Sequence, residues 1–162
     1  MEKSKIKEYK GYRYITARMP VGHVCGYVEI PKGHYLYEKD YSEPVPELEH
    51  FKEEVLNSSQ GKRGILSVLT YALKSEEERQ AMSAEMFFDV HGSLTFGNRL
   101  QFRDETETTF EWAIGFDTDH FDDTPQTQTH EFCAKECKYL IDQLVEVDKK
   151  LKELEVNNGR PS

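Results

Sequence analysis

The sequence predicts an α+β domain in which a mainly antiparallel sheet carries a long C-terminal helix on one face. Two observations lead to this prediction. Several segments alternate apolar and polar residues as strands do, and apolar residues recur at steps of three and four through the last third of the chain. The 162 residues suffice for one domain with a core. We therefore expect residues 1–156 to form a single α+β domain, followed by a disordered tail at 157–162.

Four strands and one ordered loop are predicted. Residues 11–19 and 23–31 alternate and are separated by the turn sequence "PVG", which is typical of a hairpin. Residues 32–46 are rich in Tyr, Gly, His and Pro without a helical period, so we expect an ordered loop over the sheet. Two further strands are predicted at 86–96 and 110–117, and the polar segment 97–109 is predicted to join them.

Helices are predicted on either side of these later strands. Apolar spacing after Pro46 indicates a helix at 47–56, and an apolar run at 65–73 favours another helix over a short strand followed by a helix. The longest helix is predicted at 129–155, with its apolar stripe packed on the sheet. Its end, "KKLKELEV", would either overhang the sheet or pair with a second copy, and in the second case the protein would be a homodimer through this helix. The stripe consists of His130, Cys133, Cys137, Leu140, Leu144, Val147, Leu151 and Leu154.

Composition and charge exclude some classes of function. Thirty acidic residues against 21 basic ones give a net charge of −9, and no Lys/Arg run exceeds two residues. This balance disfavours bulk nucleic acid binding. We expect no membrane segment, because no apolar run approaches the roughly 20 residues that a spanning helix needs. Cys25, Cys133 and Cys137 are an odd number without a disulfide-framework spacing, which with the lack of a secretory signal predicts a cytoplasmic protein.

Strand alternation predicts a polar face on the sheet. Val24, Gly26, Val28 and Ile30 would share the apolar face of their strand, and an unusual set of polar residues would share the other. An ordinary solvated face explains such a set. A ligand site also explains it, with His23, Tyr27, Ser93 and Thr95 as ligand-binding residues and Gly26, Gly92 and Gly115 leaving room for the ligand. The predicted polar face comprises His23, Cys25, Tyr27, Glu29, Asp89, His91, Ser93, Thr95, Glu111 and Asp117.

The acidic sequence "DTDHFDD" follows the predicted strand at 110–117. Asp117, His120 and Asp123 are spaced by three residues and could bind a divalent metal, with His91 or Asp89 completing the shell. In this hypothesis His91, Asp117 and His120 are the catalytic residues, and His91 acts as the general base. The alternative is a solvated loop whose aspartates make turn hydrogen bonds.

Two further groups of residues have both a functional and a structural interpretation. His130, Cys133 and Cys137 could hold a metal, but they continue the apolar stripe, and we favour small core residues. Tyr35, Tyr37 and Tyr41 surround His34 in the loop at 32–46. They could stack on a nucleotide base, which would make His34 a ligand-binding residue, or they could simply pack the loop.

Three stretches occur in the order found in a known family. "GHVCGYVEIPKGHYLY", "VHGSLTF" and "IGFDTDHFDD" resemble a family of small, mostly uncharacterised phage, prophage and bacterial proteins with Val-His-Gly-Gly-Leu-Thr-Tyr and Gly-Phe-Asp-x-x-His-x-x-Asp motifs. The chain departs from the family at Ser93, where glycine is usual, at Phe96 and at residues 121–122. The resemblance implies a phage or mobile-element origin, hence the host cytoplasm, and singles out His91, Asp117, His120 and Asp123.

Two hypotheses of function follow. In the first, a phage or mobile-element accessory protein has a His/Asp pocket for a small polar or phosphorylated, nucleotide-like ligand. Its sharpest form is a metal-dependent hydrolase in which the metal activates water. In the second, a non-catalytic protein sequesters a host signalling nucleotide or inhibits a host protein. Analysis of whether a bound ligand is converted separates the two.

Overall fold

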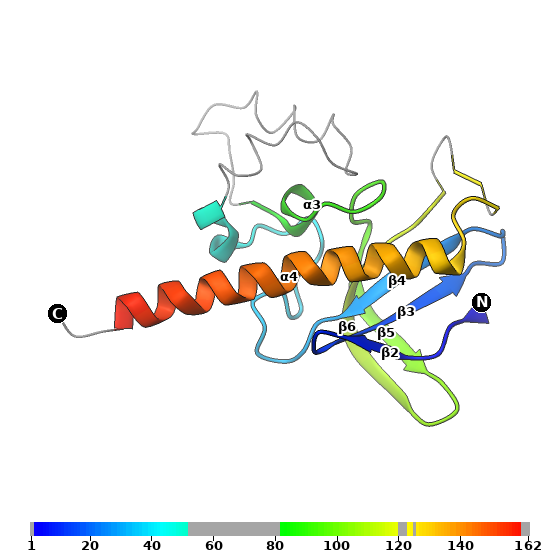
Figure 1. Ribbon diagram of the computed structural model, residues 1–162, viewed down its shortest axis with the longest axis horizontal. Coiled ribbons are helices and arrows are strands. Elements are labelled where there is room, and N and C mark those ends of the chain that lie inside the picture. Colours follow the sequence, from blue (N-terminus) through cyan, green and yellow to red (C-terminus); the bar gives the residue numbers. More distant parts are fainter. Residues whose placement is uncertain (1, 52–81, 120–122, 125, 160–162) are drawn as a thin grey trace.

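The computed structural model describes residues 2–51, 82–119, 123–124 and 126–159 of the chain (Figure 1). An antiparallel sheet lies against the long helix α4 (His130–Gly159), so the predicted α+β class is confirmed. The strand order is β1-β3-β4-β6-β5, and β2 also pairs with β3. The strands are β1 (Glu2–Lys3), β2 (Lys7–Tyr9), β3 (Tyr12–Arg18), β4 (Val24–Glu29), β5 (Phe96–Arg103) and β6 (Thr108–Phe116).

The opening hairpin and the last strand lie where the sequence predicts them. β3 and β4 are antiparallel, with Tyr14 opposite Val28 and Arg18 opposite Val24. β4 then pairs with β6 through Val28 and Ile114. β2 precedes β3 through a two-residue turn in which Lys10 and Gly11 both have positive φ, as a type I′ hairpin requires.

The predicted strand at 86–96 is wrong in its position. The short helix α3 (Ala84–Phe87) occupies its start, and β5 begins only at Phe96. Most of β5 therefore lies in the segment that was predicted to be a polar connection. The reason is local backbone geometry: Gly92 and Ser93 have φ of 69° and 78°, which interrupts an extended chain. β5 is polar because, among the described strands, it pairs only with β6 and lies at an edge of the sheet.

Both faces of the sheet are largely buried, so the predicted polar face is wrong. On the face toward α4, Val28, Ile114 and Phe116 pack with Cys137 and Leu140 of the helix. The opposite face forms a second, inner core, because the sheet curls on itself and encloses that face. Alternation predicted one apolar face, whereas buried apolar residues occur on both faces. The inner core consists of Ile15, Ala17, Cys25, Tyr27, Phe102 and Ala113.

The stripe on α4 packs on the sheet as predicted, with Cys133, Cys137, Leu140, Leu144 and Val147 buried. The C-terminal end of α4 extends past the sheet (Figure 1), and there Leu151 and Leu154 are partly buried against the core. A homodimer through this helix end stays a prediction, which light scattering on a chain ending at Val147 tests. α4 includes Asn157–Gly159, which the sequence placed in the tail; residues 160–162 lie outside the described part.

The predicted helix at 47–56 begins as the 3-10 helix η1 (Pro46–Phe51). Its remainder and the predicted helix at 65–73 lie outside the described residues. The loop at 32–46 is ordered, and Trp112 Nε1–H donates to the Lys39 carbonyl oxygen at 3.1 Å, which ties this loop to β6. Within the described part of the chain, no helix is long and apolar enough to cross a membrane.

Candidate functional site

His91 and Asp123 form a close pair beside the start of α4. His91 Nε2 lies 2.7 Å from one oxygen of Asp123 and 2.9 Å from the other. The Asp123 side chain is 4% exposed, whereas that of His91 is 25% exposed. The ring of Phe132 contacts the imidazole edge-on, with 5.1 Å between ring centroids. The pair therefore combines a buried carboxylate with a partly accessible imidazole.

Side chains of α4 hold the backbone on which His91 lies. Glu136 Oε1 accepts a hydrogen bond from the His91 backbone N–H at 2.9 Å. Gln143 accepts from the Asp89 N–H at 2.8 Å and donates to the Asp89 carbonyl at 2.7 Å. Tyr139 donates to the Asp89 carboxylate at 2.6 Å. These contacts take the place of strand pairing for residues 89–91 and fix the position of His91.

Sequence reasoning missed the three helix residues that make these contacts. Glu136, Tyr139 and Gln143 are spaced at i, i+3 and i+7, so they occupy one face of α4 beside its apolar stripe. Glu136 is buried, at 3% exposed, although it is charged. This spacing is the signal that could have found them, but it does not indicate which backbone they bind.

Asp117 directly follows β6, and its side chain meets Thr95, the residue before β5, with which it was predicted to share a face. Its Oδ2 accepts a hydrogen bond from Thr95 Oγ1 at 3.1 Å, and its Oδ1 accepts from the Asp119 N–H at 3.1 Å. The next residue, Thr118, is buried and donates to the Val24 carbonyl at 2.8 Å. Asp117 and Thr95 therefore meet just beyond the C-terminal end of β6 and just before the start of β5.

The predicted metal ligands have separate partners in the structure. Asp123 pairs with His91, while Asp117 binds Thr95. His120 lies outside the described residues. Among the residues that the structure does describe, no three His, Cys, Asp or Glu side chains gather as a metal site would require. The metal hypothesis therefore depends on His120 and on a change in the partners of Asp123.

His34 belongs to a second polar cluster, with Tyr12 and Asp148. The Leu36 N–H donates to His34 Nδ1 at 3.1 Å, so the ring proton lies on Nε2, which donates to Asp148 Oδ1 at 2.9 Å. Tyr12 Oη donates to the other oxygen of Asp148. Burial, and then Asp148, raise the pKa of Tyr12 well above its usual range. This cluster fastens the loop at 32–46 to α4.

The two clusters lie on different turns of α4. Glu136 and Asp148 are 12 positions apart, which in a helix corresponds to about 18 Å. His34 therefore does not join His91 in one site. Tyr35 stacks on His34 with 4.2 Å between ring centroids, and Arg99 lies over the Tyr37 ring. These contacts favour the packing interpretation of the aromatic loop. The Tyr35 hydroxyl is buried without a hydrogen-bond partner among the described residues.

The other predicted ligand-binding residues are also apart. Tyr27 is 6% exposed in the inner core, where it packs edge-on against Phe96. Burial raises its pKa. Ser93 donates to the Glu85 carbonyl at 3.3 Å. His23 lies in the β3–β4 turn, where its carbonyl accepts from the Met19 N–H. The predicted set does not share one surface, because the curl encloses the face that carries Tyr27.

Gly26 and Gly115 make room for neighbouring side chains rather than for a ligand. A Cβ atom on Gly26 would lie 2.5 Å from Phe116 and 2.8 Å from Cys137 Sγ. A Cβ atom on Gly115 would lie 2.5 Å from both the Gly26 carbonyl oxygen and the Tyr27 ring. The absence of a side chain at these positions lets β4, β6 and α4 pack closely.

The three cysteines are free and buried. Burial raises the pKa of Cys25 to about 11 and that of Cys133 to about 12, and raises that of Cys137 well above its usual value. All three thiols stay protonated at neutral pH. Cys133 and Cys137 are core residues, as their positions in the apolar stripe predicted.

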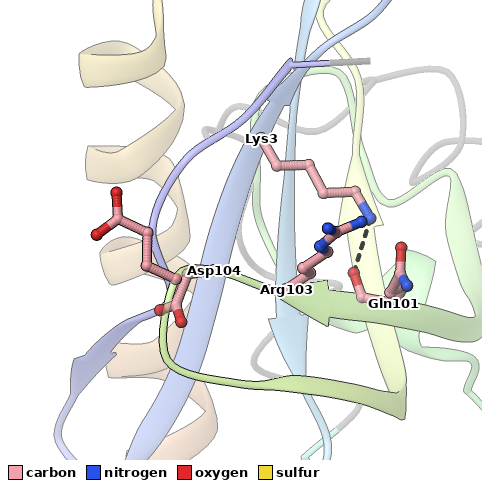
Figure 2. A pocket seen from close by; sticks show the side chains of 5 residues that line it. Lys3, Gln101, Arg103 and Asp104 are labelled. Atoms are coloured by element: carbon pink, nitrogen blue, oxygen red, sulfur yellow. Dashed lines mark hydrogen bonds between the residues drawn. The ribbon is translucent and has the colours of Figure 1, made fainter.

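A pocket of about 510 Å³ lies between β1 and the end of β5 (Figure 2). The pocket is lined by Lys3 of β1 and by Gln101, Arg103, Asp104 and Glu105 at the end of β5. Sequence reasoning singled out none of these residues. The segments meet because the curled sheet brings its edges together, and Lys3 Nζ donates to the Gln101 carbonyl at 2.8 Å.

The chain matches no family model, no curated protein and no solved structure. The resemblance to phage and prophage proteins, with the origin that it implies, stays a prediction.

Proposed function

We propose that the protein binds a small polar or phosphorylated ligand beside His91, and that His91 transfers a proton to or from this ligand. The observation that carries the proposal is the contact of His91 Nε2 with both oxygens of Asp123, at 2.7 and 2.9 Å. A buried carboxylate that holds a partly exposed histidine is the usual arrangement of an oriented acid–base group.

The pairing sets the chemistry of the imidazole. The Asp123 carboxylate accepts a hydrogen bond from Nε2–H, so the basic nitrogen of the neutral ring is Nδ1. When Nδ1 takes a proton from a water molecule or a substrate hydroxyl, the ring becomes positively charged. The Asp123 carboxylate, in contact with Nε2, keeps the ring in this orientation while the proton is transferred.

The surroundings support a fixed position for this group. The Glu136 carboxylate holds the His91 backbone, and Phe132 limits rotation of the ring. A proton-transfer group is efficient when its orientation is set before the substrate arrives. Asp117 and Thr95, at the end of the sheet, are the hydrogen-bonding groups that we assign to ligand recognition.

A metal-dependent form of this function uses Asp117 and His120 as cation ligands. Asp123 would join them only by giving up one oxygen of its contact with His91. We therefore assign Asp123 first to the orientation of His91. Addition of Mg²⁺ or Mn²⁺, and its removal by a chelator, tests the metal-dependent form in the same assay.

The test combines calorimetric titration with product analysis on a panel of nucleotides and other small phosphate esters. His91→Gln should bind the same ligand but abolish its conversion. Asp123→Asn should lower turnover by about 10²- to 10⁴-fold, the usual contribution of an acid–base group. Asp119→Asn removes a neighbouring carboxylate and should leave turnover unchanged. Equal turnover in His91→Gln and the parent would reject the catalytic role.

The non-catalytic alternative gives a different result in the same experiment. A ligand that binds tightly and is recovered intact indicates sequestration, and His91→Gln should then weaken its affinity. If this protein instead inhibits a host protein, its net charge of −9 would suit a basic target. If no phosphate ester in the panel binds or is converted, the small-ligand function is contradicted.

A further inference from the structure

We propose that the pocket between β1 and the end of β5 binds the phosphate group of a small molecule. This site is separate from the His91–Asp123 pair and involves none of its residues. The proposal rests on the placement of Lys3 and Arg103, on the hydrogen bonds of the surrounding side chains and on the shape of the curled sheet.

The curl of the sheet positions Lys3. Lys3 pairs with Ala17 of β3, and paired residues of antiparallel strands project from the same face. Ala17 is buried in the inner core, so the aliphatic part of Lys3 leaves β1 on the enclosed face. The side chain then reaches the opposite edge of the sheet, where Nζ donates to the Gln101 carbonyl at 2.8 Å. The ammonium group of Lys3 therefore lies where the edge strands β1 and β5 come together.

Two cationic groups face the same space. In Figure 2 the guanidinium of Arg103 lies beside the ammonium of Lys3, above Gln101. Burial, and then the charge of Arg103, lower the pKa of Lys3. Neither cation forms a salt bridge in the part of the chain that the structure describes. A bound anion would relieve the repulsion between them.

Most donors of these two groups are available to a ligand. An ammonium group has three N–H donors, and one of those on Lys3 is used by Gln101. A guanidinium has five, in a fork that matches two oxygens of a phosphate. The ligand must therefore supply several acceptor oxygens on one centre. Phosphate meets this need better than a single carboxylate.

Asp104 and Glu105 are the two carboxylates that line the pocket, and each leaves Lys3 and Arg103 to a ligand for a different reason. Asp104 Oδ1 accepts from the Thr106 N–H and hydroxyl, and Oδ2 accepts from the Ile6 N–H at 3.3 Å. These hydrogen bonds lower the pKa of Asp104 to about 2, so this carboxylate stays ionised within its own turn. Glu105 is exposed. It can move into solvent when an anion binds.

The volume of the pocket indicates more than a free ion. Its roughly 510 Å³ lies within the range of about 300–1,000 Å³ that is typical of small-molecule sites. A phosphate monoester with a sugar-sized group fits this range. We therefore expect inorganic phosphate to bind, and ribose 5-phosphate to bind more tightly because its sugar fills more of the pocket.

Calorimetric titration of the full chain with inorganic phosphate, ribose 5-phosphate and ribose tests the proposal. The Lys3→Gln/Arg103→Gln variant should bind ribose 5-phosphate at least tenfold more weakly than the parent. Lys149→Gln/Lys152→Gln removes two exposed cations of α4 and should bind within twofold of the parent. The amides that shift on addition of ribose 5-phosphate separate this site from the proposed function, because those of Lys3 and residues 101–105 should shift and that of His91 should not.

Three results would overturn the proposal. In the first, the parent binds neither phosphate compound. In the second, the two double variants lose affinity equally. In the third, ribose binds as tightly as ribose 5-phosphate. If the Lys3→Gln/Arg103→Gln variant does not fold, amide chemical shifts of the parent test the site instead. Phosphate should shift the amides of Lys3 and residues 101–105; shifts confined to other residues would contradict the site.

Discussion

The Glu136 carboxylate, on α4, accepts a hydrogen bond from the backbone N–H of His91 at 2.9 Å, although its side chain is almost fully buried. A charged side chain far along the chain thus holds the backbone of the candidate catalytic residue. The His91 N–H supplies this buried carboxylate with a hydrogen-bond donor, which lowers the cost of its burial. Stability and the position of His91 are therefore linked through one contact.

Replacement of Glu136 by alanine should lower the free energy of unfolding by about 1–3 kcal/mol, because the His91 N–H loses its buried acceptor. Glu136→Gln keeps a carbonyl oxygen at this position and should lower it less. Urea unfolding of the three proteins measures both effects. Equal destabilisation by alanine and glutamine would show that the hydrogen bond to His91 contributes little.

Ser93→Gly should stabilise the protein. Ser93 has a φ of 78°, a left-handed conformation that costs a residue with a side chain about 1–2 kcal/mol relative to glycine. Part of the gain is lost with the long hydrogen bond to the Glu85 carbonyl, at 3.3 Å. We expect a net gain of about 0.5–1 kcal/mol in urea unfolding. Ser93→Ala keeps the backbone strain, so it should be less stable than the parent.

Gly115→Ala should destabilise the sheet by about 1–3 kcal/mol, because its Cβ would lie 2.5 Å from the Gly26 carbonyl oxygen. The backbone of a central strand cannot move aside, whereas the flexible end of a side chain can. Thr108→Ala changes an exposed position of the same strand and should alter stability by less than about 0.5 kcal/mol. Thermal unfolding compares the two. A Gly115→Ala protein as stable as Thr108→Ala would refute close packing at this position.

Tyr12 and Asp148 should be energetically coupled, since the Tyr12 hydroxyl donates to the Asp148 carboxylate. Tyr12→Phe, Asp148→Ala and the double variant form a cycle for the free energy of unfolding. We expect a coupling of about 0.5–3 kcal/mol, the range for contacting residues. Strict additivity would mean that the hydrogen bond from Tyr12 to Asp148 does not contribute to stability.

His130 should make stability depend on pH near neutrality. Burial, and then the charge of Arg18, lower its pKa in the folded protein below the usual 6.5. Below pH 6.5 the unfolded chain therefore binds more protons at this residue than the folded protein does. Its contribution to stability is complete above pH 6.5 and is lost as the pH falls toward the folded pKa. Urea unfolding at pH 7.5 and 5.5 should show a smaller pH effect in His130→Gln than in the parent. An identical effect would contradict the prediction.

Local periodicity was sufficient for several elements. The alternation in residues 11–31 predicts the β3–β4 hairpin, and the apolar stripe predicts α4 together with its buried cysteines. The alternation in residues 110–117 also predicts that Asp117 shares a face with Thr95, and the two side chains are hydrogen-bonded. These features could be predicted because each depends on which side of a single element is buried.

The strand predicted at 86–96 shows where periodicity misleads. Phe88, Val90 and Leu94 are buried as their alternation indicates, yet their segment is not a strand. The backbone partners of this segment are Glu136 and Gln143 on α4. An alternating pattern reports which side chains are buried, but not whether the backbone binds a strand or the side chains of a helix.

By itself, the sequence determined the α+β class, the opening hairpin, β6 and the buried stripe of α4, because burial of one face leaves a period in the chain. Only the tertiary structure decided that the second face of the sheet is buried, that His34 and His91 lie in different clusters, and that Lys3 meets Arg103. The physical reason is the curl, which arises from strand twist accumulated across the whole sheet. It brings together residues about a hundred positions apart, and no local pattern records their contact.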